Sequence, residues 1–90
     1  LRASHIKPWR DSDNSERLDG NNGLMLSPHI DHLFDGGFIS FGNDGTLIVS
    51  AKLDRTIMMA WNIPSNLCVG KFNEKQSYYL DYHRNNIFLS

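Results

Sequence analysis

The chain has 90 residues, with nine Lys and Arg, ten Asp and Glu, and a formal net charge of −1. This length allows one domain with a modest core and room for one functional site. The near-neutral charge disfavours strong nucleic-acid binding by this piece alone, because such affinity comes mainly from neutralising phosphates. The single cysteine, Cys68, excludes an internal disulfide and a zinc site of four cysteines.

The sequence also predicts where in the cell the protein is located. It contains no run of about 18 apolar residues, the length that a membrane-spanning helix needs, and no signal-peptide pattern opens it. We therefore expect a cytoplasmic protein that has no membrane partner.

The first third of the chain predicts two strands. Residues 1–6 read as the end of a strand that carries His5, and Pro8 stops regular pairing because it lacks an amide hydrogen. Residues 11–22 are polar and rich in turn formers, so we expect a surface loop without an element of its own. The short apolar run 24–26 then suits a second strand.

A short helix is predicted over residues 28–34. Ser27 is a good N-cap, and Pro28 stands where a helix tolerates proline best. At about 100° per residue, one side carries the apolar residues and the remainder carries the polar ones. The apolar set is Ile30, Leu33 and Phe34, and the polar set is His29, Asp31, His32 and Asp35. Gly36 and Gly37 end the helix.

The rest of the chain predicts a β-hairpin and two helices. Residues 38–41 and 46–50 flank Gly42-Asn43-Asp44-Gly45, which favours a tight reversal between antiparallel strands. A short helix is expected near residues 54–60. Asn73 can cap a last helix over residues 74–85, whose expected packing residues are Tyr78, Leu80 and Tyr82. The predicted fold class is α+β.

Three motifs stand in a characteristic order. The first is Ser4-His5-Ile6-Lys7-Pro8-Trp9, the second is Asn22-Gly23-Leu24, and the third places Asp31 shortly before Leu33-Phe34-Asp35. Together they resemble the HNH nucleases, from Arg2 to about Phe88. The resemblance implies one domain over residues 1–90, with a ββα-metal core in 1–35 and a hairpin with a C-terminal helical extension in 36–90.

The resemblance also implies roles for particular side chains. Hydrolysis of a phosphodiester needs an activated water, charge compensation and a stabilised leaving oxygen, which an imidazole and a metal ion can supply. His5 corresponds to the general base, Asn22 to the asparagine that orients it, and Asp31 to a metal ligand. Ser4 stands where some relatives have a metal-binding Asp or His, which leaves the strand side of the site weak.

An oxygen donor such as Asp31, without a thiolate, favours Mg²⁺ over Zn²⁺, with Mn²⁺ as the next choice. Further candidates for contact with substrate or metal are Ser4, Lys7, Arg10, His29 and His32. For Lys7 and Arg10, a solvated surface role is an equal alternative. Trp9 and Trp61 are expected in the core, although an exposed Trp9 could stack on a base. For Asp35 we expect pairing with a cation or a loop cap rather than metal binding, and for His83 and Arg84 packing or surface pairing.

The function predicted from these features is a metal-dependent DNA endonuclease domain of a restriction-type or defence protein. Because His5 stands so near the first residue, we expect a longer protein with an attached recognition domain. The alternative is an inactive ββα module that binds DNA or a protein partner. The sequence leaves open whether RNA is the substrate and whether the domain forms a homodimer.

Overall fold

Helix α2 (Pro28–Asp35) lies between two small antiparallel sheets and contacts strands of both. The computed structural model describes residues 2–64 and 66–89. Strand β1 (Arg2–His5) pairs with β2 (Gly23–Leu26), and β3 (Ile39–Phe41) pairs with β4 (Leu47–Val49). The α+β class and the order of two strands, a helix and a hairpin are confirmed. Leu1, with which the first strand was expected to begin, lies outside the described residues.

The β1–β2 pair fixes the position of the first motif. Ser4 stands opposite Leu24, and His5, the last residue of β1, stands opposite Gly23. Ser4 is buried and His5 is half-buried. Beyond the strand, Ile6 is fully buried, so the chain enters the core directly after His5.

The segment between β1 and β2 is more ordered than a surface loop, and that prediction was wrong. It forms the 3₁₀ helix η1 (Trp9–Asp11), helix α1 (Asn14–Leu18) and the 3₁₀ helix η2 (Gly20–Asn22). A capping box starts α1, in which the Asp13 side chain accepts from the amide of Glu16 and the Glu16 side chain accepts from the amide of Asp13. The polar residues of this segment thus satisfy backbone groups instead of opposing a helix.

The predicted helix at 28–34 is α2, longer by one residue. Ser27 occupies the N-cap position, but its side chain makes no capping hydrogen bond, and Pro28 begins the first turn. Leu33 and Phe34 are buried as expected. The helix ends at the two glycines, where Gly37 has φ of +79° and a Cβ atom would collide with a backbone oxygen near the C-terminal end of the chain. Only glycine fits this turn.

The C-terminal half contains the expected hairpin and helices. The turn between β3 and β4 closes with Gly45 at φ of +88°. Helix α3 (Arg55–Ala60) follows the N-cap Asp54, and helix α4 (Glu74–Asn86) starts with a capping box of Asn73 and Gln76. None of the helices in the described part of the chain is long and apolar enough to cross a membrane.

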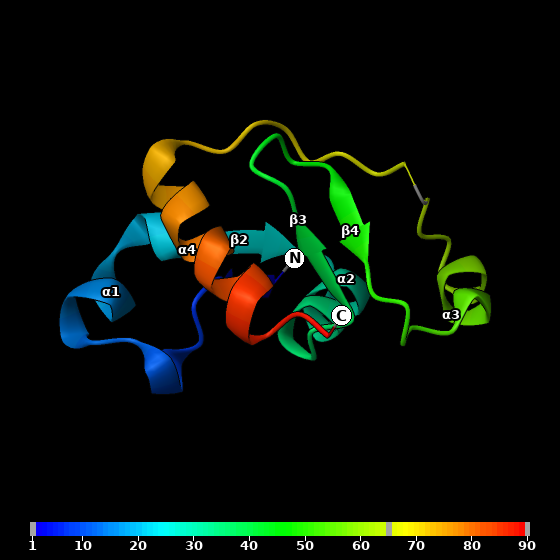
Figure 1. Cartoon of the computed structure of the whole chain (residues 1–90), viewed down its shortest axis with the longest axis horizontal. Helices are drawn as coiled ribbons and strands as arrows, with labels where there is room; N and C mark the ends of the chain where they lie inside the picture. The colour runs from blue at the N-terminus through cyan, green and yellow to red at the C-terminus, as the bar shows by residue number, and fades with distance from the viewer. Residues whose placement is uncertain (1, 65, 90) are drawn as a thin grey trace.

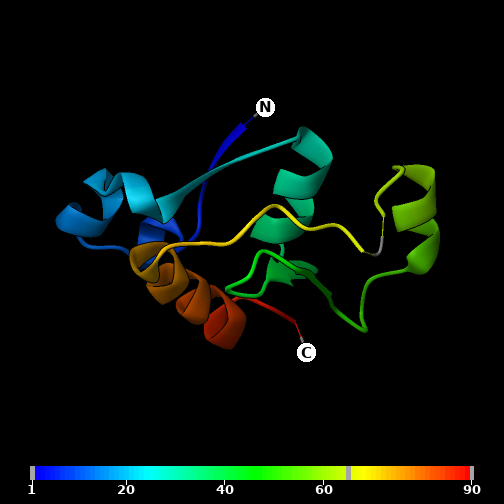
Figure 2. The same cartoon turned by 90° about the horizontal axis from the view of Figure 1, so that it is seen from above.

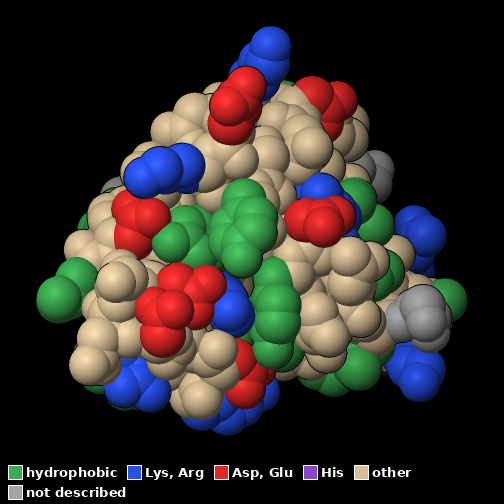
Figure 3. Space-filling view, turned by 60° about the vertical axis from the view of Figure 1, so that its left-hand side comes forward, with side chains coloured by type: hydrophobic (Ala, Val, Ile, Leu, Met, Phe, Trp, Pro, Cys, Tyr) green, Lys and Arg blue, Asp and Glu red, His purple; other side chains and the backbone are tan. Residues whose placement is uncertain are grey.

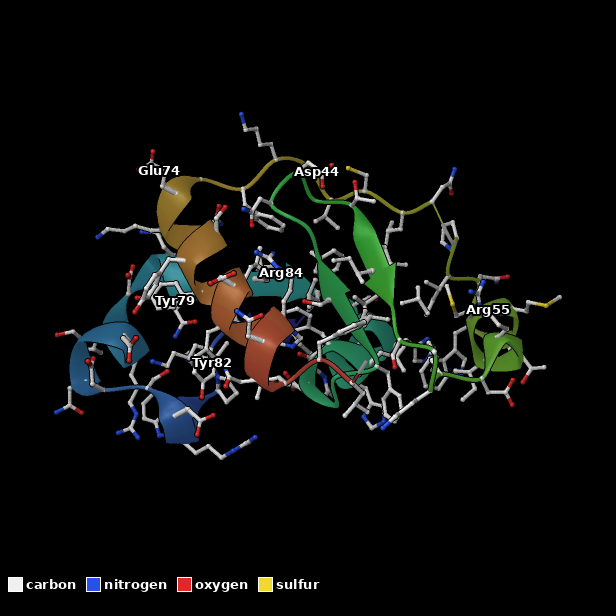
Figure 4. All side chains as sticks on the ribbon, in the orientation of Figure 1. Asp44, Arg55, Glu74, Tyr79, Tyr82 and Arg84 are labelled. Carbon is white, nitrogen blue, oxygen red and sulfur yellow. The ribbon has the colours of Figure 1, made fainter. Side chains whose placement is uncertain are left out.

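The buried face of α4 differs from the predicted one. Tyr79, Leu80 and His83 are buried, whereas Tyr78 is 64% exposed and Tyr82 is half-buried. In Figure 4, Tyr79 and Tyr82 extend from α4 toward the segment that contains α1. Their hydroxyl groups donate to Asp19 at 2.7 Å and to Asp11 at 2.9 Å. The predicted packing role is therefore correct for Leu80 and wrong for Tyr78.

The molecule is elongated, with extents of 38 × 24 × 24 Å. Figures 1 and 2 show α1 and α3 at opposite ends of the long axis, with α2, α4 and the hairpin between them. The core lies in this middle region, where Ile6, Phe34, Ile39, Phe41 and Leu80 are fully buried.

Candidate active site

A cavity of about 320 Å³ lies where β1, the residues after it, α2 and the end of α4 come together. Its polar lining side chains are Ser4, His5, Arg10, Asp31, Asp35 and His83. The sequence motifs predicted four of these as site residues, and the fold brings these four into one place.

His5 reaches the cavity from the end of β1. Its imidazole is half-buried and packs edge-on against the ring of Trp9, with ring centroids 5.5 Å apart. Trp9 itself is 55% exposed, so its expected core position is wrong. The indole and the imidazole both line the cavity.

Asn22 ties the chain after His5 to the α1 segment. Its side-chain oxygen accepts from the Lys7 amide at 2.7 Å, and its side-chain nitrogen donates to the carbonyl oxygens of Lys7 and Glu16 at 3.4 and 3.2 Å. The backbone oxygen of Asn22 accepts from Ile6 at 3.1 Å. Because Asn22 is fully buried, this geometry holds the residues that follow His5 in a fixed path.

Asp31 reaches the same cavity from α2. Asp31 is only 8% exposed, and its Oδ1 atom is buried without a hydrogen-bond partner in the part of the chain that the structure describes. A buried carboxylate oxygen without a partner is costly in free energy and usually has a ligand or functional reason. Asp31 is thus the strongest candidate for binding a cation.

Asp35 is a cavity residue that the sequence motifs did not assign to the site. Its Oδ1 accepts from the Ser4 hydroxyl at 3.0 Å, which links the end of α2 to β1. Partial burial and then the charge of Asp31 raise the pKa of this carboxyl, against the Ser4 hydrogen bond, which lowers it. Asp35 therefore pairs with the Ser4 hydroxyl, whereas the sequence predicted a cation partner or a loop cap. A signal existed, since Asp35 follows Asp31 by one helical turn.

The two basic candidates differ in their surroundings. Lys7 makes an ion pair with Glu16 at 2.9 Å, with both side chains about 15% exposed, and it lies over the ring of Tyr82. The hydrogen bond that Lys7 donates to the Glu16 carboxylate raises the pKa of Lys7. Lys7 does not line the cavity, whereas Arg10 does and its side chain is 75% exposed. Arg10 is therefore the better placed of the two for a phosphate.

His29 and His32 lie outside the cavity lining. His29 stacks on Trp61 with ring centroids 4.5 Å apart, and His32 meets the same indole edge-on at 6.4 Å. Trp61 is half-buried at the end of α3. These histidines join α2 to α3, and the structure does not bring them together with His5.

The structural roles expected for His83 and Arg84 are confirmed. His83 is buried and bonded to Ser40 and to the backbone oxygen of Phe34. Arg84 donates to the backbone oxygen of Phe41 at 2.8 Å and to Asn43 at 3.0 Å. His83 forms part of the cavity wall, but its two ring nitrogens are already engaged.

The side chains that line the cavity fit a weakly bound cation that prefers oxygen ligands. Among residues 2–64 and 66–89, no three His, Cys, Asp or Glu side chains converge into a complete metal site. The unpartnered Oδ1 of Asp31 is the kind of atom that Mg²⁺ binds, and this ion commonly keeps several waters and takes few protein ligands. The residues therefore fit a divalent cation at Asp31.

Comparison with known protein families gives a match to the first part of the chain. Residues 1–42 match the family described as HNH endonuclease, which confirms the resemblance drawn from the motifs. The matched segment contains β1, β2, α2 and β3, and so includes His5, Asn22 and Asp31. No curated protein matches the chain.

Proposed function

We propose that this chain is the cleavage domain of a metal-dependent DNA endonuclease, because residues 1–42 match the HNH endonuclease family. The family match by itself indicates nuclease activity in general. The observation that carries the finer proposal is that the half-buried imidazole of His5 and the unpartnered carboxylate of Asp31 line one cavity. A base and an anionic cation ligand side by side are what phosphodiester hydrolysis requires.

In the proposed reaction, His5 is the general base. It takes a proton from a water molecule, whose oxygen forms a bond to phosphorus while the bond from phosphorus to the 3′ oxygen breaks. The leaving oxygen takes a proton from solvent, so the products carry a 5′ phosphate and a 3′ hydroxyl. Asn22 contributes by holding the backbone directly after His5.

Asp31 would hold the divalent cation, for which Mg²⁺ is the first choice and Mn²⁺ the second, because the donors are oxygens. A cation bound there supplies positive charge that stabilises the phosphate oxygens and the leaving oxygen in the transition state. Arg10, exposed beside the cavity, is placed to contact a neighbouring phosphate.

The charge distribution supports a need for further DNA contacts. The chain has a net charge of −1, and at the end of the molecule that carries α1, Figure 3 shows acidic and basic side chains intermingled instead of one basic surface. We therefore include an attached recognition domain in the proposal, as in a restriction-type or defence protein. A cytoplasmic location is also proposed, in keeping with the exposed free thiol of Cys68.

The proposal is tested by nicking of supercoiled plasmid with Mg²⁺, with Mn²⁺ and with EDTA. We expect cleavage only with a divalent cation. His5→Ala should lower the rate by at least about a hundredfold, because removal of a general base typically costs that much. His29→Ala is the matched control, since its ring stacks on Trp61 outside the cavity, and it should cleave like wild type.

Four outcomes would change the conclusion. Cleavage that persists in EDTA, or a fully active His5→Ala protein with an unchanged melting temperature, would overturn the mechanism. Binding of DNA without any nicking would favour the inactive ββα module. Faster cleavage of labelled RNA than of DNA duplex would move the substrate to RNA.

A further inference from the structure

A large aromatic side chain, Trp9, is exposed at the cavity that contains His5. Trp9 is 55% exposed and lines the cavity. Its indole meets the imidazole of His5 edge-on, with ring centroids 5.5 Å apart. The exposed indole and the proposed general base thus border the same small space.

The indole is held in place by contacts with residues that follow it in the chain. The guanidinium of Arg17 lies over the ring, 4.6 Å from its centroid, and Nε of Arg17 donates to the backbone oxygen of Trp9 at 3.0 Å. The same oxygen accepts from the Ser12 amide at 3.2 Å, at the end of η1. Because the backbone and the ring of Trp9 are both held, little conformational freedom is lost when a ligand binds to the indole.

One face of the indole is open to a flat ligand. The guanidinium covers the other face, and the edge-on imidazole covers only part of the ring, so the exposed surface lies mainly on the open face and the rim. In a nucleic acid the flat group is the base, and every base can stack on an aromatic ring because each has a π face. The open face therefore fits a nucleobase.

A base can reach this face only after it has left the duplex stack. In double-stranded DNA both faces of a base are covered by its neighbours, so proteins that contact a base face bind a single strand or extrude the nucleotide. Arg10 follows Trp9 directly, and its 75% exposed side chain at the cavity can contact the phosphate joined to that nucleotide. Stacking would also add affinity that a chain of net charge −1 gains only weakly from phosphates.

We propose that Trp9 stacks on an unpaired nucleobase beside the scissile phosphate, so that the His5 site acts on DNA where a nucleotide has left the helix, as in a single strand or a bulge. This rests on the proposed function and names the form of its substrate. Trp9 is then a substrate-binding residue. The stacked base places the phosphate of the same nucleotide near the imidazole, because base and phosphate are joined through one sugar.

The test measures tryptophan fluorescence of the whole chain in EDTA at low salt. In a Trp61→Phe background, Trp9 is the only tryptophan, so its emission is observed alone. We expect a short oligothymidylate to quench this emission. It should also bind at least about fivefold more tightly than a fully paired blunt duplex of the same length, because stacking of a base on an aromatic ring contributes at least this much.

Variants of Trp9 separate stacking from other contacts. Fluorescence anisotropy of a labelled oligothymidylate should show that Trp9→Ala weakens binding by at least about fivefold, whereas Trp9→Phe keeps a ring and loses less. Tyr78→Ala is the matched control, because Tyr78 is a 64% exposed aromatic residue of α4 outside the cavity lining. It should bind the oligothymidylate like wild type.

Other results overturn the proposal. Trp9→Ala with the affinity and melting temperature of wild type would do so, as would equal affinity of wild type for single strand and duplex. If Trp9 serves only to pack against His5, oligothymidylate will leave the Trp9 emission unchanged, and Trp9→Ala will cleave more slowly with unchanged affinity. Tighter binding of oligouridylate than of oligothymidylate would overturn the assignment to DNA.

Cleavage assays distinguish this inference from the proposed function. A duplex with an unpaired thymidine should be cut beside that nucleotide at least about fivefold faster than a fully paired duplex, and Trp9→Ala should remove the difference. If wild type cuts both duplexes equally while His5→Ala is inactive, stacking is refuted and the nuclease stands. If oligothymidylate binding depends on Trp9 but wild type cuts no DNA, the stacking site stands and the nuclease is refuted.

Discussion

At the scale of single residues, the buried side-chain amide of Asn22 holds the chain beside the cavity that contains His5. Its side chain makes three hydrogen bonds, two to Lys7 and one to Glu16, while it is fully buried. An asparagine is suited to this place because it offers an acceptor and donors at the same time. This side chain, together with the Ser12 hydroxyl that donates to the carbonyl oxygens of Lys7 and Pro8, holds the residues that follow His5.

The first prediction at this scale concerns Asn22→Ala. Truncation leaves the Lys7 amide without its acceptor and removes one of the donors to the carbonyl oxygens of Lys7 and Glu16, so we expect the free energy of unfolding to fall by about 1–3 kcal/mol. Cleavage should fall as well, because the backbone after His5 loses its anchor. Urea denaturation followed by tryptophan fluorescence measures the first effect, and plasmid nicking measures the second.

Asn21→Ala is the control for this prediction. Asn21 precedes Asn22 in the same 3₁₀ helix, but it is half-buried and bonds to Asp19 and Asn73 at the surface. Its loss should change stability and cleavage less. Equal stability of Asn22→Ala and wild type would show that the buried amide does not anchor the site.

At the scale of elements, short helices in this chain depend on their caps. Helix α1 has five residues and helix α4 has thirteen, and both begin with a reciprocal capping box. Isolated helices of such lengths are marginal in water, so the satisfied N-terminal amides add to the stability that tertiary packing supplies. Asn73 also donates to Asn21 at 3.0 Å, which connects the start of α4 to η2.

We expect Asn73→Ala to lower the free energy of unfolding by about 1 kcal/mol, the usual cost of losing an N-cap. Asn85→Ala, at an exposed position near the other end of α4, should stay within about 0.5 kcal/mol of wild type. Chemical denaturation of both variants measures the difference. Two variants of equal stability would contradict the role assigned to the capping box.

At the scale of the whole molecule, His83 connects three elements. From α4, its ring lies parallel to Phe34 of α2 at 3.9 Å, and its Nδ1 is 2.8 Å from the hydroxyl of Ser40 in β3. Its Nε2 is 2.8 Å from the backbone oxygen of Phe34. Because a carbonyl oxygen only accepts, Nε2 donates, and Nδ1 accepts from Ser40. The neutral imidazole thus satisfies both contacts.

This arrangement predicts a pH dependence of folding. Burial lowers the pKa of His83 from its ordinary value of 6.5, so the folded protein favours the neutral ring. The unfolded chain therefore takes up the proton first as the pH falls. The stabilisation is complete above about pH 6.5 and declines between the unfolded and folded pKa values, by about 1.4 kcal/mol per pH unit.

Nuclear magnetic resonance titration of the His83 imidazole should give a pKa below 6.5, and unfolding experiments between pH 7 and pH 5 should show the loss of stability. The variant His83→Gln keeps hydrogen-bonding capacity without this titration, so its unfolding free energy should depend less on pH. A His83 ring that titrates at or above its ordinary pKa would contradict the prediction.

The sequence by itself determined the elements whose ends are specified by residues close to them in the chain. Proline at the start and glycines at the end bound α2, and Gly42-Asn43-Asp44-Gly45 specifies the turn between β3 and β4. Asp13 and Glu16 also stand at capping-box spacing, so α1 could have been predicted from its own residues. The order of the His5, Asn22 and Asp31 motifs, too, was sufficient to indicate the family.

Only the tertiary structure decided which side of α4 is buried and which carboxylates share the cavity. The polar composition of α4 gives little apolar periodicity, so packing on η2, on β3 and on Phe34 of α2 selects Tyr79, Leu80 and His83. Ser4 and Asp35 are 31 residues apart, and their hydrogen bond exists only because β1 and α2 pack together. Local spacing specifies a helix and its ends, whereas a contact across the core depends on how separate elements dock.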